Sequence, residues 1–165
     1  MIIYSEIFKD LNKHRVQYVI VGGLAYNLLG GFRMTSDLDI LVQMTNKNLA
    51  KVVMVLKSHG YKVHQPVDPM GIADAKIRRE WIDDKNMKAF NFFKDRSLNQ
   101  VDIIIESPIS YEQAKSKVVY VHVDGLKLPV INADQLIKMK KKASRPIDLA
   151  DIEELKIIKK LRSKE

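Results

Sequence analysis

The sequence predicts an α/β protein, because segments with the 3.6-residue apolar period of helices alternate with short apolar runs that are typical of strands. The Asp124-Gly125 pair between two such runs is a strong hairpin signal. A chain of 165 residues can bury one substantial core, and no repeat, low-complexity tract or linker divides it. We therefore expect one domain over residues 1–165, with a helical C-terminal segment over 132–165.

In the first half of the chain, helices with one apolar face flank two short strands. Ser5 is a candidate N-cap for the first helix, Asn46 caps the third helix, and Gly60 ends it. Gly30 and Gly31 stop the short second helix. The expected elements are a helix over 5–15, a strand over 18–21, a helix over 24–29, a strand over 38–43, a helix over 46–59 and a more polar helix over 72–83.

The second half of the chain is richer in strands. Asn132 and Gln135 form an Asn-x-x-Gln capping box, and Pro146 suits the first turn of a final helix. The expected elements are strands over 87–93 and 101–105, a helical turn over 110–115, hairpin strands over 118–123 and 126–130, a helix from 132 to about 143 and a last helix from 146.

The composition is that of a soluble protein. The chain has no cysteine, which excludes disulfides and thiolate metal sites and suits a reducing compartment. No apolar run approaches the ~18 residues of a membrane span, and residues 1–15 lack the long apolar core of a signal peptide. We expect a cytoplasmic protein with no membrane partner.

The net charge of +8 is concentrated towards the C-terminus, in basic clusters over residues 138–145 and 156–164. A basic surface attracts polyanions through a salt-sensitive field, so RNA is one conceivable partner. The alternative is that these lysines are simply the solvated faces of two helices.

Asp37 and Asp39 are the most informative residues for chemistry. They are two positions apart in a strand-like run, so both side chains should point to the same face of the sheet. Two carboxylates held side by side repel each other unless a cation lies between them. The pair therefore suggests a divalent metal site.

Gly22 and Gly23 end the preceding strand and suggest what the metal is for. A glycine turn at a helix N-terminus exposes backbone N–H groups that phosphate oxygens can approach. A metal site beside a phosphate cradle is typical of enzymes that act on nucleotides.

The order of these motifs resembles the nucleotidyltransferase fold that is shared with DNA polymerase beta. More narrowly, residues 22–40 are similar to the GGxAxxxxG and RxTxDLDI segments of small bacterial and archaeal proteins related to the nucleotidyltransferase toxins of abortive-infection systems. Residues 136–155, LIKMKKKASRPIDLADIEEL, are similar to the closing Lys, Arg-Pro, Asp and Asp-Ile pattern of that family. The resemblance implies an α/β (α+β) nucleotidyltransferase fold in which helices flank a mixed β-sheet.

The same resemblance implies a third carboxylate on a later strand. Asp102 is the best match, and Glu106 at the other end of that run is its competitor. Asp37, Asp39 and Asp102 would then be the catalytic and metal-binding residues, holding two Mg²⁺ (or Mn²⁺) ions. Asp102 would also help to deprotonate the attacking hydroxyl.

The resemblance also assigns residues to the nucleotide. Gly22 and Gly23 would contact the triphosphate through backbone N–H groups, although many relatives have Ser at the second position. The remaining assignments fall on the loop before the Asp pair and on the penultimate helix: Arg33, Thr35, Ser36 and Lys140. Asp148 and Asp151 are expected to cap and brace the last helix.

These features predict an enzyme that moves a nucleoside monophosphate from an NTP to a hydroxyl. The acceptor is left open between tRNA, protein and a small molecule, and a cognate antitoxin protein is a further possible partner. One alternative is a non-catalytic member of the fold that binds a nucleotide or a partner. Another is a nucleic-acid-binding protein that depends on its basic C-terminus.

Overall fold

The computed structural model describes residues 2–164, in which six strands form one mixed sheet with the order β3-β4-β2-β1-β6-β5. The strands are β1 Tyr18–Val21, β2 Asp37–Val42, β3 Ala89–Phe93, β4 Gln100–Ile104, β5 Val119–Val123 and β6 Leu126–Val130. The helices are α1 Ser5–Lys13, α2 Gly22–Leu28, α3 Asn46–Ser58, the 3₁₀ helix η1 Pro69–Ala73, α4 Ala75–Asp83, α5 Tyr111–Ser116, α6 Ala133–Ala143 and α7 Pro146–Arg162. The predicted α/β fold with a mixed sheet is confirmed.

Strand β2 is the centre of the sheet and joins its two halves. It runs antiparallel to β1, with Val21 opposite Asp39, and parallel to β4, with Asp102 opposite Asp39. This register places acidic residues of two distant segments side by side on adjacent strands.

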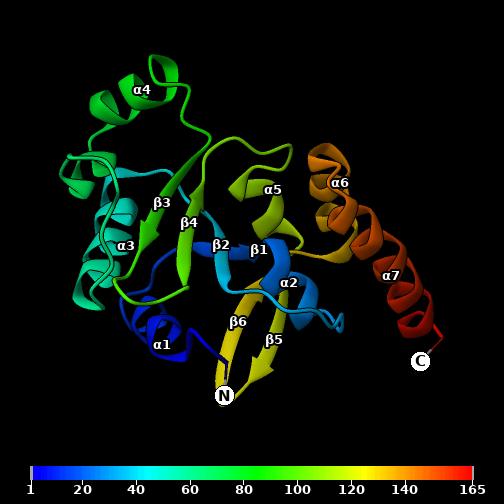
Figure 1. Cartoon of the computed structure of the whole chain (residues 1–165). Helices are drawn as coiled ribbons and strands as arrows, with labels where there is room; N and C mark the ends of the chain where they lie inside the picture. The colour runs from blue at the N-terminus through cyan, green and yellow to red at the C-terminus, as the bar shows by residue number, and fades with distance from the viewer. Residues whose placement is uncertain (1, 165) are drawn as a thin grey trace.

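Helices flank the strands of the sheet (Figure 1). In the view of Figure 1, α1 and α3 lie to the left of the strands, and α6 and α7 lie to the right. Leu38 and Ile40, which alternate with the two Asp residues of β2, are fully buried. The Phe8 ring of α1 stacks on Tyr18 of β1, with 6.3 Å between ring centroids. One continuous core therefore fixes the strand that carries the acidic pair.

The first elements differ from the prediction in two ways that matter for the site. Helix α2 begins at Gly22 rather than Leu24, because Gly22 turns the chain directly from strand to helix with a φ of +68°. The N-cap of α3 is Thr45 rather than Asn46, since the Thr45 side chain accepts a hydrogen bond from the backbone N–H of Asn48.

The second half of the chain follows its local signals closely. Asp124 and Gly125 both have positive φ, as a two-residue hairpin loop requires. Asn132 accepts from the backbone N–H of Gln135 and caps α6, and Pro146 is the first residue of α7. Within residues 2–164, no helix is long and apolar enough to cross a membrane.

Candidate functional site

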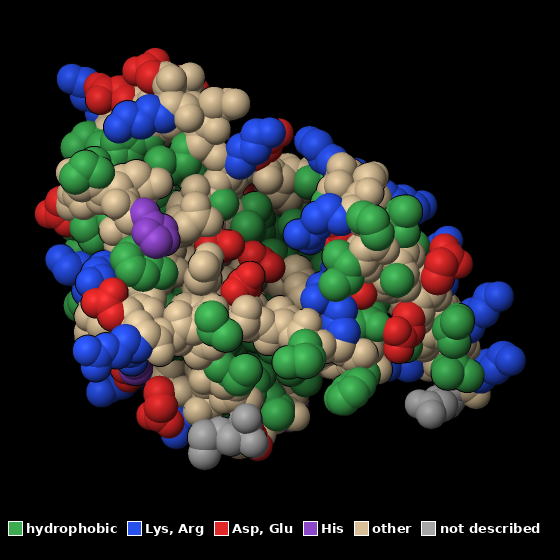
Figure 2. Space-filling view, in the orientation of Figure 1, with side chains coloured by type: hydrophobic (Ala, Val, Ile, Leu, Met, Phe, Trp, Pro, Cys, Tyr) green, Lys and Arg blue, Asp and Glu red, His purple; other side chains and the backbone are tan. Residues whose placement is uncertain are grey.

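Three acidic side chains lie on one face of the central strands. Asp37 and Asp39 alternate with buried residues along β2, and Asp102 lies opposite Asp39 on β4. Figure 2 shows acidic side chains gathered at the centre of this face of the molecule. Glu106, the competing candidate, lies beyond the end of β4 and is not part of this group.

Asp39 is held in an environment that disfavours its charge. Burial, and after it the carboxylates of Asp102 and Asp37, raise the pKa of Asp39 to about 6, while Arg145 and Lys140 oppose the shift. Burial also raises the pKa of Asp102. Neighbouring carboxylates of this kind are stabilised as anions by a cation placed among them.

Gly22 lies against the Asp39 carboxylate at the N-terminus of α2. A Cβ atom at residue 22 would lie 2.0 Å from Oδ2 of Asp39, so any side chain there would displace the carboxylate. The glycine thus lets the first turn of α2, with its exposed N–H groups, approach the acidic pair directly.

Gly23 is enclosed by the loop that connects α2 to β2. A Cβ atom there would lie 2.8 Å from Oγ1 of Thr35 and 2.9 Å from Nη2 of Arg33. A side chain at residue 23 would therefore meet Thr35 and Arg33.

Thr35 and Ser36 take different positions on this loop. The Thr35 hydroxyl faces Gly23, whereas Oγ of Ser36 donates to Oδ1 of Asp37 at 2.9 Å. The Tyr4 hydroxyl bonds to the backbone carbonyls of Ser36 and Gln100 and so ties together the starts of β2 and β4. Ser36 therefore orients a carboxylate, and the sequence had assigned it to the nucleotide.

Asn91 is a site residue that sequence reasoning missed. It lies opposite Asp102 on β3, and its Nδ2 donates to Oδ1 of Asp102 at 2.7 Å. This bond lowers the pKa of Asp102 and opposes the effect of burial. Asn91 belongs to no sequence motif, so only the pairing of β3 with β4 shows that it holds the Asp102 carboxylate.

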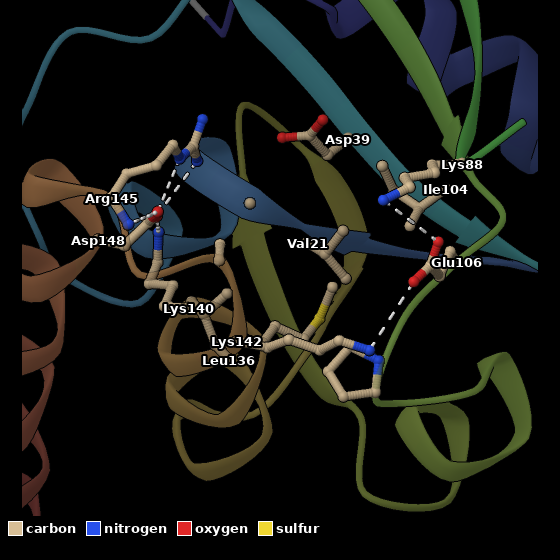
Figure 3. Close-up of a pocket in the computed structure, with 14 residues that line it drawn as sticks. Val21, Asp39, Lys88, Ile104, Glu106, Leu136, Lys140, Lys142, Arg145 and Asp148 are labelled. Carbon is tan, nitrogen blue, oxygen red and sulfur yellow. Dashed lines mark hydrogen bonds and ion pairs between the residues drawn. The ribbon is translucent and has the colours of Figure 1, made fainter. Parts of the chain in front are cut away.

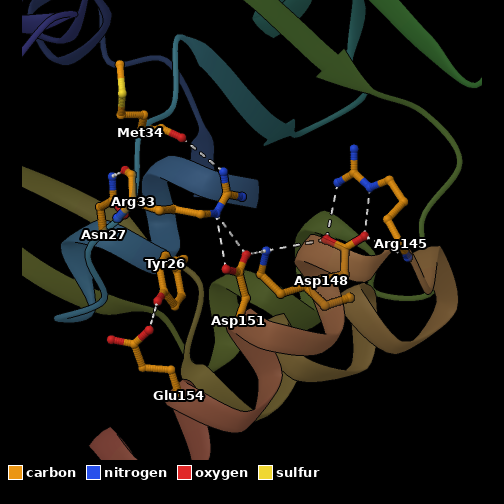
Figure 4. A network of polar contacts seen from close by, with 9 residues as sticks. Tyr26, Asn27, Arg33, Met34, Arg145, Asp148, Asp151 and Glu154 are labelled. Atoms are coloured by element: carbon orange, nitrogen blue, oxygen red, sulfur yellow. Dashed lines mark hydrogen bonds and ion pairs between the residues drawn. The ribbon is translucent and has the colours of Figure 1, made fainter.

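A buried network of charges joins the loop before β2 to the last two helices (Figure 4). Nε of Arg33 donates to both carboxylate oxygens of Asp151 at 3.1 Å, and Nζ of Lys140 donates to Oδ2 of the same residue at 2.7 Å. Lys140 is only 4% exposed and also lies 3.6 Å from Oδ1 of Asp148. Its ammonium group is therefore a counterion within the fold as well as part of the wall of the site.

Arg145 is the cation of this network that reaches towards solvent. Its Nε and Nη2 donate to the two oxygens of Asp148, at 2.7 and 3.2 Å, while its side chain remains 67% exposed. Burial alone would raise the pKa of Asp148, but Arg145 holds it below its ordinary value. Asp148 and Asp151 brace the last helix, as expected, and in addition orient the two arginines.

A pocket of about 360 Å³ connects these groups (Figure 3). Asp39 lies at one end with Arg145 beside it, and Gly22 also lines the pocket. Its floor is apolar, formed by side chains of β1, β4 and α6: Val21, Ile104, Leu136, Met139 and Ala143. On the opposite side, Glu106 pairs with Lys88 and Lys142 at 3.8 and 3.9 Å. The pocket thus offers a polar, mostly basic rim around an apolar floor, an arrangement that suits a nucleotide.

A family model for aminoglycoside-2''-adenylyltransferase matches residues 4–155, which include every residue of the site described above. The chain belongs to this family. It is therefore a nucleotidyltransferase, and the predicted enzyme class is confirmed. No curated protein sequence gives a significant match.

Solved structures confirm the fold of this adenylyltransferase family member. The lincosamide adenylyltransferase LnuA, bound to lincomycin, has a TM-score of 0.63 at 18% identity over 93% of this chain and 94% of its own. ANT(2'')-Ia in complex with adenylyl-2''-tobramycin has a TM-score of 0.56 at 13% identity over 97% and 95%. A Thermotoga maritima protein described as a nucleotidyltransferase has a TM-score of 0.54 at 14% identity over 99% and 92%.

The donor set suits a hard divalent cation. Carboxylate oxygens are the preferred ligands of Mg²⁺, and the mutual repulsion that contributes to the raised pKa of Asp39 is the property that such an ion would relieve. Within residues 2–164, no three His, Cys, Asp or Glu side chains are gathered closely enough to form a complete metal-binding group. The case for a divalent cation here therefore rests on two observations: Asp37, Asp39 and Asp102 are all carboxylates, and they lie on one face of the sheet.

Proposed function

We propose that this protein transfers AMP from ATP to a hydroxyl group of a small molecule and releases pyrophosphate. One observation carries the proposal: the Asp39 carboxylate lies against Gly22 at the N-terminus of α2, with Asp102 beside it on the neighbouring strand. Membership in an adenylyltransferase family supports ATP as the donor.

The proposed reaction is a substitution at the α-phosphorus of ATP. The acceptor oxygen forms a bond to this phosphorus, the bond to the β-phosphate bridge breaks, and pyrophosphate leaves with the electron pair. The hydroxyl proton passes to Asp102 and then to water. Asn91 would keep one oxygen of that carboxylate in place.

Mg²⁺ ions held by Asp37, Asp39 and Asp102 would supply positive charge for the phosphates and the leaving pyrophosphate. The chain adds two kinds of donor of its own. The N–H groups at the start of α2 would contact phosphate oxygens, and the exposed guanidinium of Arg145 would pair with the terminal phosphates. Asp148 keeps Arg145 extended along the pocket for that purpose.

The acceptor is proposed to be a small molecule because the named relatives are associated with antibiotics, namely lincomycin and tobramycin. RNA, protein and antitoxin partners, and a toxin–antitoxin role, are predictions from the sequence that these relatives do not support. A cysteine-free chain is consistent with the cytoplasm, where ATP and Mg²⁺ are available.

The test is to incubate the purified protein with Mg²⁺ and each α-³²P-labelled NTP in the presence of lincomycin, tobramycin, tRNA or a small-molecule extract. The expected result is pyrophosphate release and transfer of label from ATP to a small molecule. The Asp37→Asn variant should bind ATP more weakly in Mg²⁺ and form no product.

Two outcomes would reject the proposal. One is that no NTP binds in the presence of Mg²⁺, and the other is that Asp37→Asn retains full activity. ATP binding without any labelled product, in every acceptor mixture, would favour a non-catalytic nucleotide-binding protein instead.

A further inference from the structure

A stacked pair of aromatic rings lies at the β3 edge of the sheet. The ring of His64 stacks on that of Phe93 in β3, with 3.9 Å between the ring centroids and 8° between the ring planes. His64 is exposed and Phe93 is half-buried, so the His64 side of the stack is accessible to solvent. These two rings are called the aromatic platform below.

Backbone pairing holds the segment that carries His64 against the outer edge of β3. The backbone N–H of Lys62 donates to the carbonyl of Phe93, and the N–H of Phe93 donates to the carbonyl of Lys62, both at 2.9 Å. Nζ of Lys62 lies 5.7 Å from the centroid of the Phe93 ring and pairs with Asp95 at 2.5 Å. The platform is therefore supported by the sheet and does not depend on a lone loop side chain.

Strand register brings the platform to the same face of the sheet as Asp102. Asn91 is opposite Asp102, and Phe93 is opposite Gln100. Asn91 and Phe93 are two positions apart on one strand and so share a face, and Asn91 reaches the Asp102 carboxylate at 2.7 Å. Phe93 is thus the diagonal neighbour of Asp102, and residues in this relation lie about 7–8 Å apart.

This face of β3 and β4 is open to solvent. Residues that point to the opposite face are buried: Phe90, Phe92, Val101 and Ile103. Asn91, Phe93 and Asp102 are only partly buried. Figure 2 shows a histidine side chain on the face that carries the central acidic side chains. A small molecule can therefore lie across both strands and contact the platform and Asp102 together.

The platform and the proposed phosphate donors lie on different sides of β2. Gly22, which opens α2, follows β1, and it lines the first pocket together with Arg145. Strands β4 and β3 lie beyond β2 in the sheet order. In phosphoryl transfer the attacking and leaving oxygens lie roughly in line on opposite sides of the phosphorus. With pyrophosphate leaving on the β1 side, the acceptor hydroxyl would approach from the side of β4 and β3, where Asp102 can take its proton.

We propose that the aromatic platform binds the acceptor, and that the acceptor is a small, uncharged ring compound whose C–H face stacks on His64 while one of its hydroxyls reaches Asp102. An apolar surface with a few polar groups beside it is the usual composition of a small-molecule site. This inference rests on the proposed nucleotidyl transfer and specifies where its second substrate binds.

The charges around the platform favour a small molecule over a single-stranded nucleic acid. Aromatic rings also stack on unpaired bases, but such sites combine the rings with a basic groove for the phosphates. Here the charge of Lys62 is compensated by Asp95, and three carboxylates share the face of the platform. The basic clusters of the chain belong instead to α6 and α7.

The test uses the full chain with ¹³C-labelled His and Phe rings, Mg²⁺ and a non-hydrolysable ATP analogue. Phenyl β-glucoside is the uncharged ring probe, and oligouridylate is the nucleic-acid probe. The glucoside should produce saturable shifts of the His64 and Phe93 ring signals. His64→Ala should weaken glucoside binding at least about fivefold, as expected for the loss of one stacking contact, whereas His64→Phe should retain it.

His122→Ala is the matched control, because His122 is also exposed but lies on β5, at the opposite edge of the sheet. This control should bind the glucoside normally, and all three variants should bind the ATP analogue as the wild type does. The inference would be overturned by the absence of saturable shifts, by equal losses in His64→Ala and His122→Ala, or by a His64→Phe variant as weak as His64→Ala. Oligouridylate binding that is tighter than glucoside binding and is lost in His64→Ala would also overturn it. Failure of the ATP analogue to bind the wild type would reject the proposed function instead.

Discussion

Replacing Asp39 by Asn should stabilise the metal-free protein at neutral pH while it abolishes activity. The pKa of this carboxyl is raised from 3.8 to about 6 by burial and by its acidic neighbours. A shift of about two units corresponds to at most about 3 kcal/mol of folding free energy lost when the group ionises. An Asn side chain keeps the shape of the carboxylate and removes that cost.

The sign of the pH dependence follows from the direction of the shift. A raised acid pKa means that the folded state binds the proton more tightly, so the contribution of Asp39 to stability is most favourable below about pH 4. This contribution is lost as the pH rises from about 4 through about 6. The Asp39→Asn variant lacks this loss, so its stability relative to the wild type should be highest at pH 8, where its Tm should be higher by about 10 °C at most. The difference in Tm should vanish near pH 4.

Urea and thermal unfolding of both proteins in EDTA, from pH 4 to pH 8, would measure this difference. Asp83→Asn, at an exposed position on α4, serves as the control for the substitution itself. Added Mg²⁺ should then raise the stability of the wild type and leave Asp39→Asn nearly unchanged. An advantage for Asp39→Asn that does not depend on pH, or a variant less stable than wild type at pH 8, would refute the electrostatic reasoning.

Three further predictions follow from the contacts. Gly22→Ala should lower activity at least about tenfold, because its Cβ would lie 2.0 Å from a carboxylate oxygen of Asp39. Gly125→Ala is the control: its φ is similarly positive and nothing lies within 4 Å, so it should cost only about 1 kcal/mol of backbone strain. Turnover measurements and urea unfolding of both variants would test this. Asp151→Asn should cost about 3 kcal/mol by urea unfolding, since it leaves a buried lysine and an arginine poorly paired. Asp134→Asn, which breaks an exposed pair with a lysine, should cost less than about 1 kcal/mol, and equal losses would contradict this. Arg145→Gln should raise the KM for ATP about tenfold with a smaller change in kcat, and an unchanged KM would remove the residue from the phosphate site.

Local signals in the sequence were enough to predict most of the elements. The capping box of Asn132, the Asp124-Gly125 hairpin and the apolar period of α3 act over a few residues, so a linear reading detects them. The start of α2 was missed because Gly22 was interpreted as part of a turn before the helix, whereas α2 begins at Gly22, where a positive φ turns the chain sharply out of β1.

By itself, the sequence determined the acidic pair and the glycines at the strand end, because two residues in alternation on one strand must share a face. It could not show which distant residues meet them. Asn91 reaches Asp102 through strand register, and Arg33 reaches Asp151 across 118 positions of the chain. Only tertiary packing decided that Lys140 is buried between two carboxylates, since burial depends on how α6 and α7 pack together and not on the residue's place in a motif.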